Sequence, residues 1–166
     1  TEVKQKDVRS FSYWFDGNNR IAHWVAYPIY KDIAEDNVNR TDSWTYEPKL
    51  PQWCQPALFK GWGVSGYDRG HQLPSQDRVS STAANQQTFY FTNIIAQNSD
   101  LNQSAWGNLE NKVRELSKGC DTLYVVTGVV ISTNESPQIE YIKDNDGKMV
   151  AKPKALFKVL LRYSSS

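Results

Sequence analysis

The stretch YDRGHQLPSQDR, residues 67–78, places one of the two histidines of the chain, His71, directly behind an Asp-Arg-Gly triplet. Gly70 before it allows a close backbone approach or an unusual turn. Four charged residues flank the imidazole in sequence: Asp68, Arg69, Asp77 and Arg78. Such a setting can tune the pKa of a histidine near neutral pH, as acid–base chemistry requires. A charged surface turn is the alternative, and the spacing alone does not decide between the two.

A second set of polar residues falls on a predicted amphipathic helix over residues 103–118, which Gly119 ends. Its apolar residues recur at steps of three and four: Ala105, Trp106, Leu109, Val113 and Leu116. Asn102 stands where this helix begins, and Glu110 and Arg114 share its polar face. An amide oxygen and a carboxylate suit a hard cation such as Mg²⁺. The ordinary alternatives are a helix N-cap and a solvated ion pair.

Composition limits the kinds of site that are available. The 166 residues are about one domain in size, 39% of them are hydrophobic, and the formal net charge is +1. This small net charge neither supports nor excludes a nucleic-acid partner, so such a partner would have to bind in a local basic groove. The two histidines and two cysteines do not stand at any recognised spacing of a zinc finger or a zincin site. Cys54 and Cys120 form either one disulfide or two buried thiols, and their spacing leaves both possibilities open.

The coarse pattern along the chain predicts an α+β fold with a mixed, mainly antiparallel central sheet and helices packed on it. Four segments rich in β-branched and aromatic residues are predicted strands: 21–30, 88–95, 123–131 and 155–163. The last two are continuous apolar runs, typical of strands covered on both faces. Residues 31–60 are predicted to be mostly loop, pinned by the buried rings of Trp44, Tyr46 and Trp53. Residues 80–87 are predicted to be a short helix or loop.

Two further local features bear on the site. Asn145-Asp146-Gly147 predicts a tight hairpin turn. His23 lies in an apolar segment and is expected to be a packed or rim histidine without a catalytic role. No apolar run is long enough to cross a bilayer. The chain opens with the polar stretch TEVKQKDVRS and without Met, which fits a removed leader or an arbitrary boundary equally well.

Taken together, YDRGHQLPSQDR and the later stretch TNIIAQNSDLNQSAWGNLENKVRE resemble the DNA/RNA non-specific endonucleases, a family with a ββα-metal site and a DRGH signature. The resemblance extends upstream to HWVAY and NRTDSWTYEPKL and downstream through VVTG to FKVLL, so it covers most of residues 20–163. DRGH alone is a weak signal, whereas DRGH followed by TNI, SDLNQ and WxxLE is specific. The resemblance implies a single nuclease domain over residues 1–166, truncated at its C-terminus relative to the family.

The resemblance also implies roles for particular residues. It makes His71 the general base, Asn102 the direct Mg²⁺ ligand and Glu110 the holder of metal-bound water. It gives Asp68 a supporting role and matches Asn93 to a polar site residue. Four arginines are expected to face the phosphate or line the nucleic-acid groove: Arg40, Arg69, Arg78 and Arg114. The spacing from Arg40 to the following Trp differs slightly from that of the family, and Arg20 is the competing candidate for its role.

The function implied is a Mg²⁺-dependent endonuclease, with Mn²⁺ or another divalent cation as possible substitutes, which cuts DNA and RNA with little sequence or sugar preference. Its products would carry 5′-phosphate ends. Export to the medium, the periplasm or the cell surface is expected, for scavenging or as a toxin, with an inhibitor protein and a homodimer as further candidate partners. The alternatives are a non-catalytic nucleic-acid-binding module, a phosphodiesterase for small nucleotides, and a structural domain with coincidental motifs.

Overall fold

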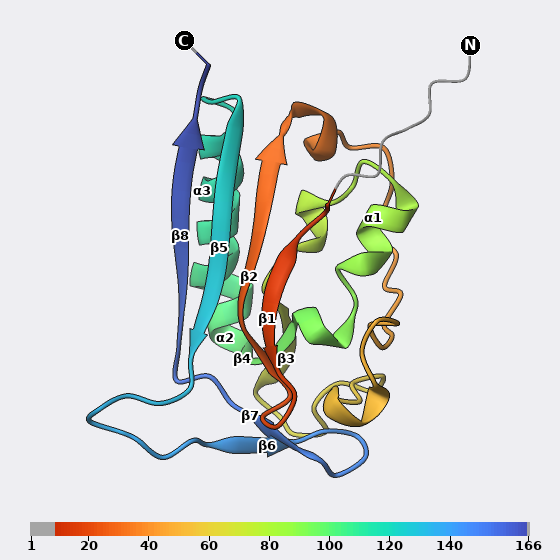
Figure 1. The fold of residues 1–166 in the computed structure, drawn as a ribbon, viewed down its shortest axis with the longest axis vertical. Helices are drawn as coiled ribbons and strands as arrows, with labels where there is room; N and C mark the ends of the chain where they lie inside the picture. The colour runs from red at the N-terminus through yellow and green to blue at the C-terminus, as the bar shows by residue number, and fades with distance from the viewer. Residues whose placement is uncertain (1–8, 166) are drawn as a thin grey trace.

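A four-stranded antiparallel sheet with strand order β1-β2-β5-β8 forms the centre of the computed structural model, which describes residues 9–165 (Figure 1). Its strands are β1 (Ser12–Asp16), β2 (Ile21–Tyr30), β5 (Thr122–Val130) and β8 (Ala155–Tyr163). The predicted α+β class with a mainly antiparallel sheet is confirmed. Most of the charged opening segment considered above lies outside the described residues.

The predicted strands at 21–30, 123–131 and 155–163 match β2, β5 and β8 to within one residue. β5 is central, as its continuous apolar run indicates, and it pairs with β2 on one side and β8 on the other. The expectation that the run 155–163 is covered on both faces is wrong. β8 lies at the edge of the sheet, and alternate side chains along it are exposed: Phe157, Val159, Leu161 and Tyr163.

A second antiparallel pair leads into the main helix. β3 (Tyr67–His71) pairs with β4 (Ile94–Asn98), and the chain then enters α2 (Ser99–Leu101). A π-helical turn (Asn102–Trp106) joins α2 to α3 (Gly107–Ser117), so the helical segment is continuous. This succession of two strands and a helix is the ββα arrangement that the resemblance implies.

The predicted strand 88–95 is wrong over residues 88–93, because β4 (Ile94–Asn98) begins only at Ile94. Thr88 follows α1 (Thr82–Gln87), and Phe91–Asn93 form a single 3-10 turn before β4 begins. The aromatic residues that suggested a strand, Phe89 and Phe91, are buried because they pack in the core. Their hydrophobicity therefore reflects burial and not strand geometry.

The helix begins four residues earlier than the pattern predicts. The Asn98 side chain accepts a hydrogen bond from the Leu101 amide and caps the first turn, so Asn102 lies inside the helical segment and is not an N-cap. Leu109, expected on the buried face, is exposed. The helix does end as predicted, with Ser117 as its last residue and Gly119 donating its amide to the Leu116 carbonyl.

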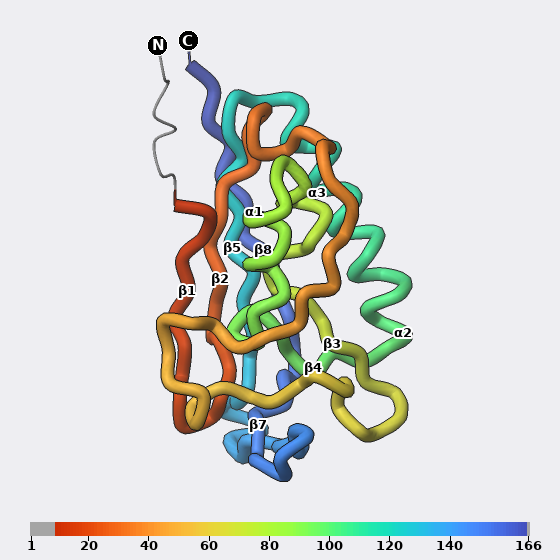
Figure 2. Tube along the Cα trace, turned by 90° about the vertical axis from the view of Figure 1, so that its right-hand side faces the viewer, coloured from red at the N-terminus to blue at the C-terminus, as the bar shows by residue number. Residues whose placement is uncertain are grey.

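The main core lies between the sheet and α3. One face of β2 and β5 contributes Val25, Tyr27, Leu123 and Val125, and Val113 of α3 packs against them. In Figure 1, α3 lies behind β5 and β8, and Figure 2 shows it from the side, next to the sheet. The helix that carries the polar residues singled out above is thus fixed by burial of its opposite side.

Long connections cover the remaining edges of the molecule. Residues 31–66 contain only two 3-10 turns (Lys31–Ala34 and Gln52–Cys54), and Trp44 and Tyr46 pack against a core cluster. Trp53 does not, since its side chain is largely exposed. The predicted turn lies in a separate hairpin of β6 (Tyr141–Lys143) and β7 (Met149–Ala151), with Gly147 at φ +80°.

Two questions that the sequence raised are settled by the described residues. Cys54 and Cys120 are free thiols. Within residues 9–165, no helix has both the length and the apolar character needed to cross a membrane.

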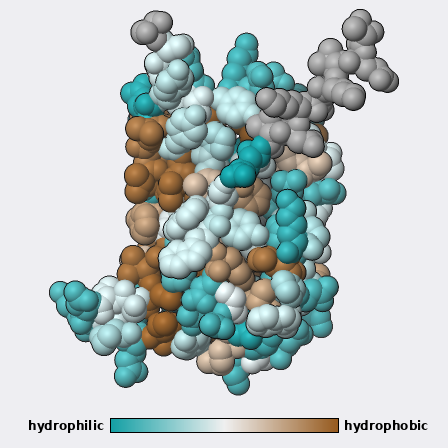
Figure 3. Space-filling model, in the orientation of Figure 1, coloured by the Kyte–Doolittle hydropathy of each residue, from teal (hydrophilic) through white to brown (hydrophobic). Residues whose placement is uncertain are grey.

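The outer face of the sheet is apolar but uncovered in this chain. Figure 3 shows hydrophobic side chains gathered over the β8 side of the molecule. Leu161, on this face, is 66% exposed, whereas Leu123, on the inner face of the neighbouring strand, is 0% exposed. The two leucines therefore provide a matched test of which face supports the fold.

We predict that Leu123→Ala lowers the free energy of unfolding by about 2–5 kcal/mol, because it removes buried methylenes and leaves a cavity. Leu161→Ala is expected to change it by less than about 1 kcal/mol, since its side chain is already in water. Urea denaturation followed by tryptophan fluorescence at low protein concentration measures both. Equal losses in the two variants would contradict this assignment of the core.

Candidate active site

One pocket of about 340 Å³ gathers residues from the β3 end, the helix and the long loop. Five of its lining residues were predicted from sequence: Arg40, Arg69, His71, Asn102 and Glu110. Pro74, Ser75 and Gln76, which follow β3, complete the wall. The ββα arrangement therefore brings together the candidate base, the candidate metal ligands and two of the candidate phosphate-binding arginines.

The position of His71 depends on the glycine before it. Gly70 pairs with Ile95 in the β3–β4 ladder, and the side chain of Gln97 lies directly over it. A Cβ at position 70 would meet the Gln97 Oε1 atom at 2.2 Å, which no side chain allows. Gly70 therefore lets the two strands and Gln97 pack closely, and His71 follows as the last residue of β3.

The imidazole of His71 is held neutral by its surroundings. Burial, followed by the positive charges of Arg40 and Arg69, lowers its pKa to about 3, although a hydrogen bond with the Arg69 backbone acts in the opposite direction. The predicted tuning to neutral pH is therefore wrong for the protein alone. Its Nε2 atom is buried and finds no hydrogen-bond partner among the described residues. A neutral imidazole with an unused ring nitrogen is suited to accept a proton.

Aromatic rings fix the plane of this imidazole. The Trp44 ring centroid lies 5.4 Å from that of His71, and the Phe89 ring meets His71 edge-on at 5.0 Å. These contacts exclude water from one side of the ring and account for much of its burial. The long loop that carries Trp44 is thus part of the site.

Asp68 orients Asn102. Its Oδ2 atom accepts a hydrogen bond from Asn102 Nδ2 at 2.9 Å, and only the NH₂ side of an amide can donate to a carboxylate. The amide oxygen of Asn102, a pocket-lining residue, is therefore turned away from Asp68. Asp68 also accepts hydrogen bonds from Gln103 and Ser99. Together with the bond from Asn102 they lower the pKa of the Asp68 carboxyl, and the bond from Gln103 has the largest effect.

Glu110 is a half-buried carboxyl with a displaced pKa. Its pKa is raised to about 7, mainly by burial and also by the charge of Asp77, although the charges of Lys158 and Arg114 act in the opposite direction. Lys158 reaches this region from β8, where its ammonium donates to Thr127 Oγ1 at 2.7 Å. Burial likewise lowers the pKa of Lys158 to about 8.

The arginine of the signature is held by an aromatic ring. The guanidinium of Arg69 lies 3.7 Å from the centroid of Trp44, and its Nη1 atom donates to the Leu58 carbonyl at 3.0 Å. Arg40 donates to Ser75 Oγ at 3.1 Å and pairs with Asp42 at 2.8 Å. Both guanidinium groups line the pocket with His71, and they form its positive wall.

Arg20, the competing candidate for the role of Arg40, lies elsewhere and donates to the Met149 carbonyl at 3.0 Å. Arg40, not Arg20, therefore lines the site.

Arg114 compensates a buried carboxylate. Its Nη1 atom lies 2.9 Å from Asp77 Oδ1, and the Asp77 side chain is only 2% exposed. Burial raises the pKa of Asp77, and the bond and the charge of Arg114 lower it. Asp77 was expected to influence the imidazole, but its main partner is on the helix.

Two predicted site residues have structural positions instead. Arg78 was placed on the nucleic-acid surface, and this is wrong because it is fully buried and donates to the carbonyls of Ser10 and Pro28. Asn93 is also fully buried. Its amide group bonds the backbone of Leu73 and Thr88, so it shapes the segment after β3 without lining the pocket.

Sequence reasoning missed two contributors. Trp44 was assigned only to loop packing, and its role in holding Arg69 and His71 has no local signal. Lys158 did have a local signal in the sequence, because it alternates with Leu156 and Leu160 on the inward face of a strand that is otherwise mostly apolar. A charged residue in such a position indicates a buried partner.

The donor set of the pocket fits a divalent cation with several waters. Among the described residues, no cluster of three or more His, Cys, Asp or Glu side chains with the geometry of a metal site occurs. The turned amide oxygen of Asn102 and the carboxyl of Glu110 provide oxygen ligands in one pocket. Mg²⁺ needs few protein ligands, since it retains much of its water.

A sequence profile of the DNA/RNA non-specific endonucleases matches residues 1–166. The chain belongs to this family. Its members are divalent-metal-dependent nucleases.

Family relatives with known names include a nuclease of Nostoc sp., 35% identical over 154 residues that cover 91% of this chain and 52% of the relative. Human mitochondrial endonuclease G is 31% identical over 159 residues, 94% of this chain and 54% of the relative. The chain thus spans about half the length of these relatives.

A crystal structure of the EndoG/EndoGI complex contains a chain with the same fold. It superposes with a TM-score of 0.75 at 24% identity and covers 96% of this chain and 68% of that chain. The similarity supports the ββα arrangement as a property of the family fold.

We predict that the metal-free protein contains one titrating carboxyl near pH 7 and a non-titrating imidazole. Glu110 should be protonated below its pKa of about 7 and ionised above it, whereas His71 should stay neutral from pH 5 to 8. NMR titration of side-chain carbons, assigned with Glu110→Gln and His71→Gln, measures both.

In Lys158→Met the Glu110 midpoint should rise, because the positive charge that lowers it is lost. A His71 midpoint near 6.5 would contradict the assigned environment.

Proposed function

We propose that this chain is the catalytic part of a Mg²⁺-dependent endonuclease that hydrolyses phosphodiester bonds of DNA and RNA and leaves 5′-phosphate ends. The observation that carries the proposal is the meeting of His71, Asn102 and Glu110 in one pocket of a ββα arrangement, walled by Arg40 and Arg69. Family membership supports the reaction class. The choice of cation, the role of His71 and the polarity of cleavage are parts of the proposal.

His71 would act as the general base. Its unpartnered ring nitrogen would take a proton from the attacking water as the new oxygen–phosphorus bond forms. A pKa of about 3 makes the free imidazole a weak base. A bound phosphate would offset the charges of Arg40 and Arg69, which lower that pKa, so substrate binding would make His71 more basic.

The arginines would stabilise the charge that develops on the phosphate. Arg69 is rigidly held on Trp44, so it can meet the phosphate with little reorganisation. Arg40 is more exposed and pairs with Asp42, a contact that the phosphate would replace. Breakage of the bond from phosphorus to the 3′ oxygen would leave a 5′-phosphate on the downstream fragment and, once the leaving oxygen takes a proton from solvent, a 3′-hydroxyl on the upstream fragment.

Asn102 and Glu110 would hold the cation, Asn102 directly through its amide oxygen and Glu110 through bound water. When bound, Mg²⁺ supplies Lewis-acid stabilisation of the phosphate and the leaving oxygen. Asp68 would keep the Asn102 oxygen directed at the cation, because it holds the NH₂ group of the same amide.

This site contacts a phosphate and offers its arginines to the backbone. Phosphate contacts carry no direct sequence information. We therefore expect little sequence preference and a steep loss of activity with added salt.

The decisive experiment is incubation of the protein with plasmid DNA and with a long RNA, in Mg²⁺ or in EDTA. Wild type should degrade both polymers only with Mg²⁺, and His71→Ala should be about 10²–10⁴-fold slower. His23→Ala is the matched control, since it removes the other histidine, which is paired with Asp16 outside the pocket. Equal rates for wild type and His71→Ala would exclude His71 as the base.

Absence of cleavage with retained binding of the polymers would favour the non-catalytic module. Cleavage of a small phosphodiester alone would favour a nucleotide hydrolase. The two alternatives raised by the sequence are thus separate outcomes of one assay.

We predict that Asp68→Ala weakens Mg²⁺ binding by about 10- to 100-fold, the usual effect of removing a residue that orients a metal ligand. Titration calorimetry with Mg²⁺ alone measures it. Ser99→Ala is the control, because it removes one bond to Asp68 and leaves the Asp68–Asn102 bond intact. Unchanged affinity in Asp68→Ala would show that Asn102 needs no such support.

An inhibitor protein also belongs to this proposal. The solved structure of similar fold is that of an EndoG/EndoGI complex and concerns the inhibition of EndoG. A pocket walled by exposed arginine would favour an acidic inhibitor surface. Homodimerisation and export stay predictions from the sequence.

A further inference from the structure

Trp106 lies where the π-helical turn meets α3, and its indole N–H group is buried without a partner. The side chain is 5% exposed, and its Nε1 atom finds no hydrogen-bond partner among the described residues. An indole N–H can only donate, and a buried one usually finds an acceptor. Packing in the core explains the ring of Trp106, but it does not explain the unused N–H group.

The carboxyl of Glu110 is the acceptor beside this N–H group. Trp106 and Glu110 are four residues apart in one helical segment, so their side chains are neighbours on its surface. The pKa of Glu110 is raised mainly by burial, and the Trp106 side chain is among the groups that lower it, as a donor close to a carboxylate does. The two groups do not meet the geometry of a hydrogen bond in this structure. They are therefore adjacent and complementary, with the bond between them not yet formed.

The π-helical turn brings Asn102 to the same side of the helix. Eight residues of a uniform α-helix make about 2.2 turns, which would leave Asn102 and Glu110 roughly 80° apart. A π turn takes one more residue, because its hydrogen bonds run from residue i to i+5, and the offset then falls to roughly 20°. The two candidate ligands of the cation therefore face one way, and Trp106 lies four residues from each.

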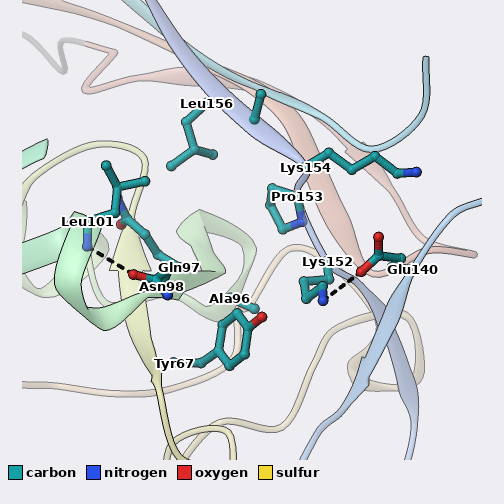
Figure 4. Close-up of a pocket in the computed structure, with 11 residues that line it drawn as sticks. Tyr67, Ala96, Gln97, Asn98, Leu101, Glu140, Lys152, Pro153, Lys154 and Leu156 are labelled. Atoms are coloured by element: carbon teal, nitrogen blue, oxygen red, sulfur yellow. Dashed lines mark hydrogen bonds and ion pairs between the residues drawn. The ribbon is translucent and has the colours of Figure 1, made fainter. Parts of the chain in front are cut away.

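The ring of Trp106 is restrained by a lysine. The ammonium of Lys158 lies 5.0 Å from the Trp106 ring centroid, which is within the range of a cation–π contact. Lys152, outside the site, shows the more usual arrangement, since its ammonium pairs directly with the Glu140 carboxylate at 2.6 Å (Figure 4). Lys158 contacts the ring and two hydroxyl groups instead, so it holds the indole in place.

We propose that Trp106 is a positioning residue for Glu110. When the cation site is filled, its N–H group donates to one oxygen of the Glu110 carboxylate and leaves the other oxygen to hold cation-bound water. An indole suits this task because it has no acceptor to offer, so it fixes the carboxylate without competing for the cation. Groups that orient metal ligands in this way are worth about 10- to 100-fold in metal affinity. This inference rests on the proposed function, which gives Glu110 its part in holding the cation.

The test is a double-mutant cycle on Mg²⁺ affinity, measured by titration calorimetry with Mg²⁺ alone at pH 8, above the Glu110 pKa of about 7. Trp106→Phe keeps an aromatic ring and removes the N–H group, so it should weaken binding by about 10-fold or more. In a Glu110→Ala background, where Asn102 remains, the same change should alter the affinity by less than about twofold. Trp24→Phe is the control, because it makes the same substitution on β2 outside the pocket.

A second measurement follows the indole directly in wild type. In a ¹H–¹⁵N spectrum, the assigned Trp106 indole signal should move downfield when Mg²⁺ is added, because its proton enters a hydrogen bond with a charged acceptor. The Trp62 indole already donates to the Asp68 carbonyl at 2.9 Å, so its signal is the reference and should move much less. This spectrum decides alone if Trp106→Phe does not fold.

The outcomes separate the two proposals. An equal loss of affinity from Trp106→Phe with and without the Glu110 carboxyl would assign Trp106 to packing and overturn the inference. Binding of Mg²⁺ by wild type that leaves the Trp106 signal in place would overturn it as well. Both results leave the nuclease function standing. Absence of Mg²⁺ binding by wild type would count against the cation of the proposed function and against the inference together.

Discussion

The hydrogen bond from Asn102 to Asp68 is the constraint on which the site depends. It joins the first strand of the ββα arrangement to the helix, across 34 residues of sequence. Because Asp68 also accepts from Ser99 and Gln103, one carboxylate fixes the entry of the helix beside β3. The same bond decides which atom of the Asn102 amide is free, so fold and chemistry are set by one contact.

A group of buried charges beside the pocket, which compensate one another, also supports the site. Asp77 is buried and pairs with Arg114, and Lys158 brings a further positive charge from the edge strand toward Glu110. Each of these groups alone would be costly to bury. Burial and these charges hold the pKa of the Glu110 carboxyl above its ordinary value, whereas burial, Arg40 and Arg69 hold the pKa of His71 below its ordinary value.

The local sequence pattern was sufficient to predict the long secondary-structure elements and the residues of the DRGH signature. The runs at 21–30, 123–131 and 155–163 are strands because β-branched side chains fill both sides of an extended backbone. The pattern failed at 88–95, where buried rings belong to a turn, and at Asn102, where the cap is Asn98. Arg78 lies close to the motif in sequence yet is fully buried, since adjacency in the chain does not report burial. Trp44 joins the site only through tertiary packing, which no spacing reveals, whereas the alternation along β8 gave a local signal for Lys158.

In the proposed mechanism, the two arginines of the pocket lower the pKa of His71 before the substrate binds and lose much of this effect when a phosphate neutralises them. In the free protein, their charges and the surrounding burial keep the imidazole deprotonated, so its nitrogen is available. A phosphate that neutralises Arg40 and Arg69 removes the repulsion that opposes protonation. Under the proposed mechanism, His71 would therefore become a stronger base when the phosphate binds, whereas in the free protein the ring carries no charge. The proposed mechanism would thus couple proton transfer to the binding of a phosphate, and it would not require a histidine whose pKa is near neutral in the free protein.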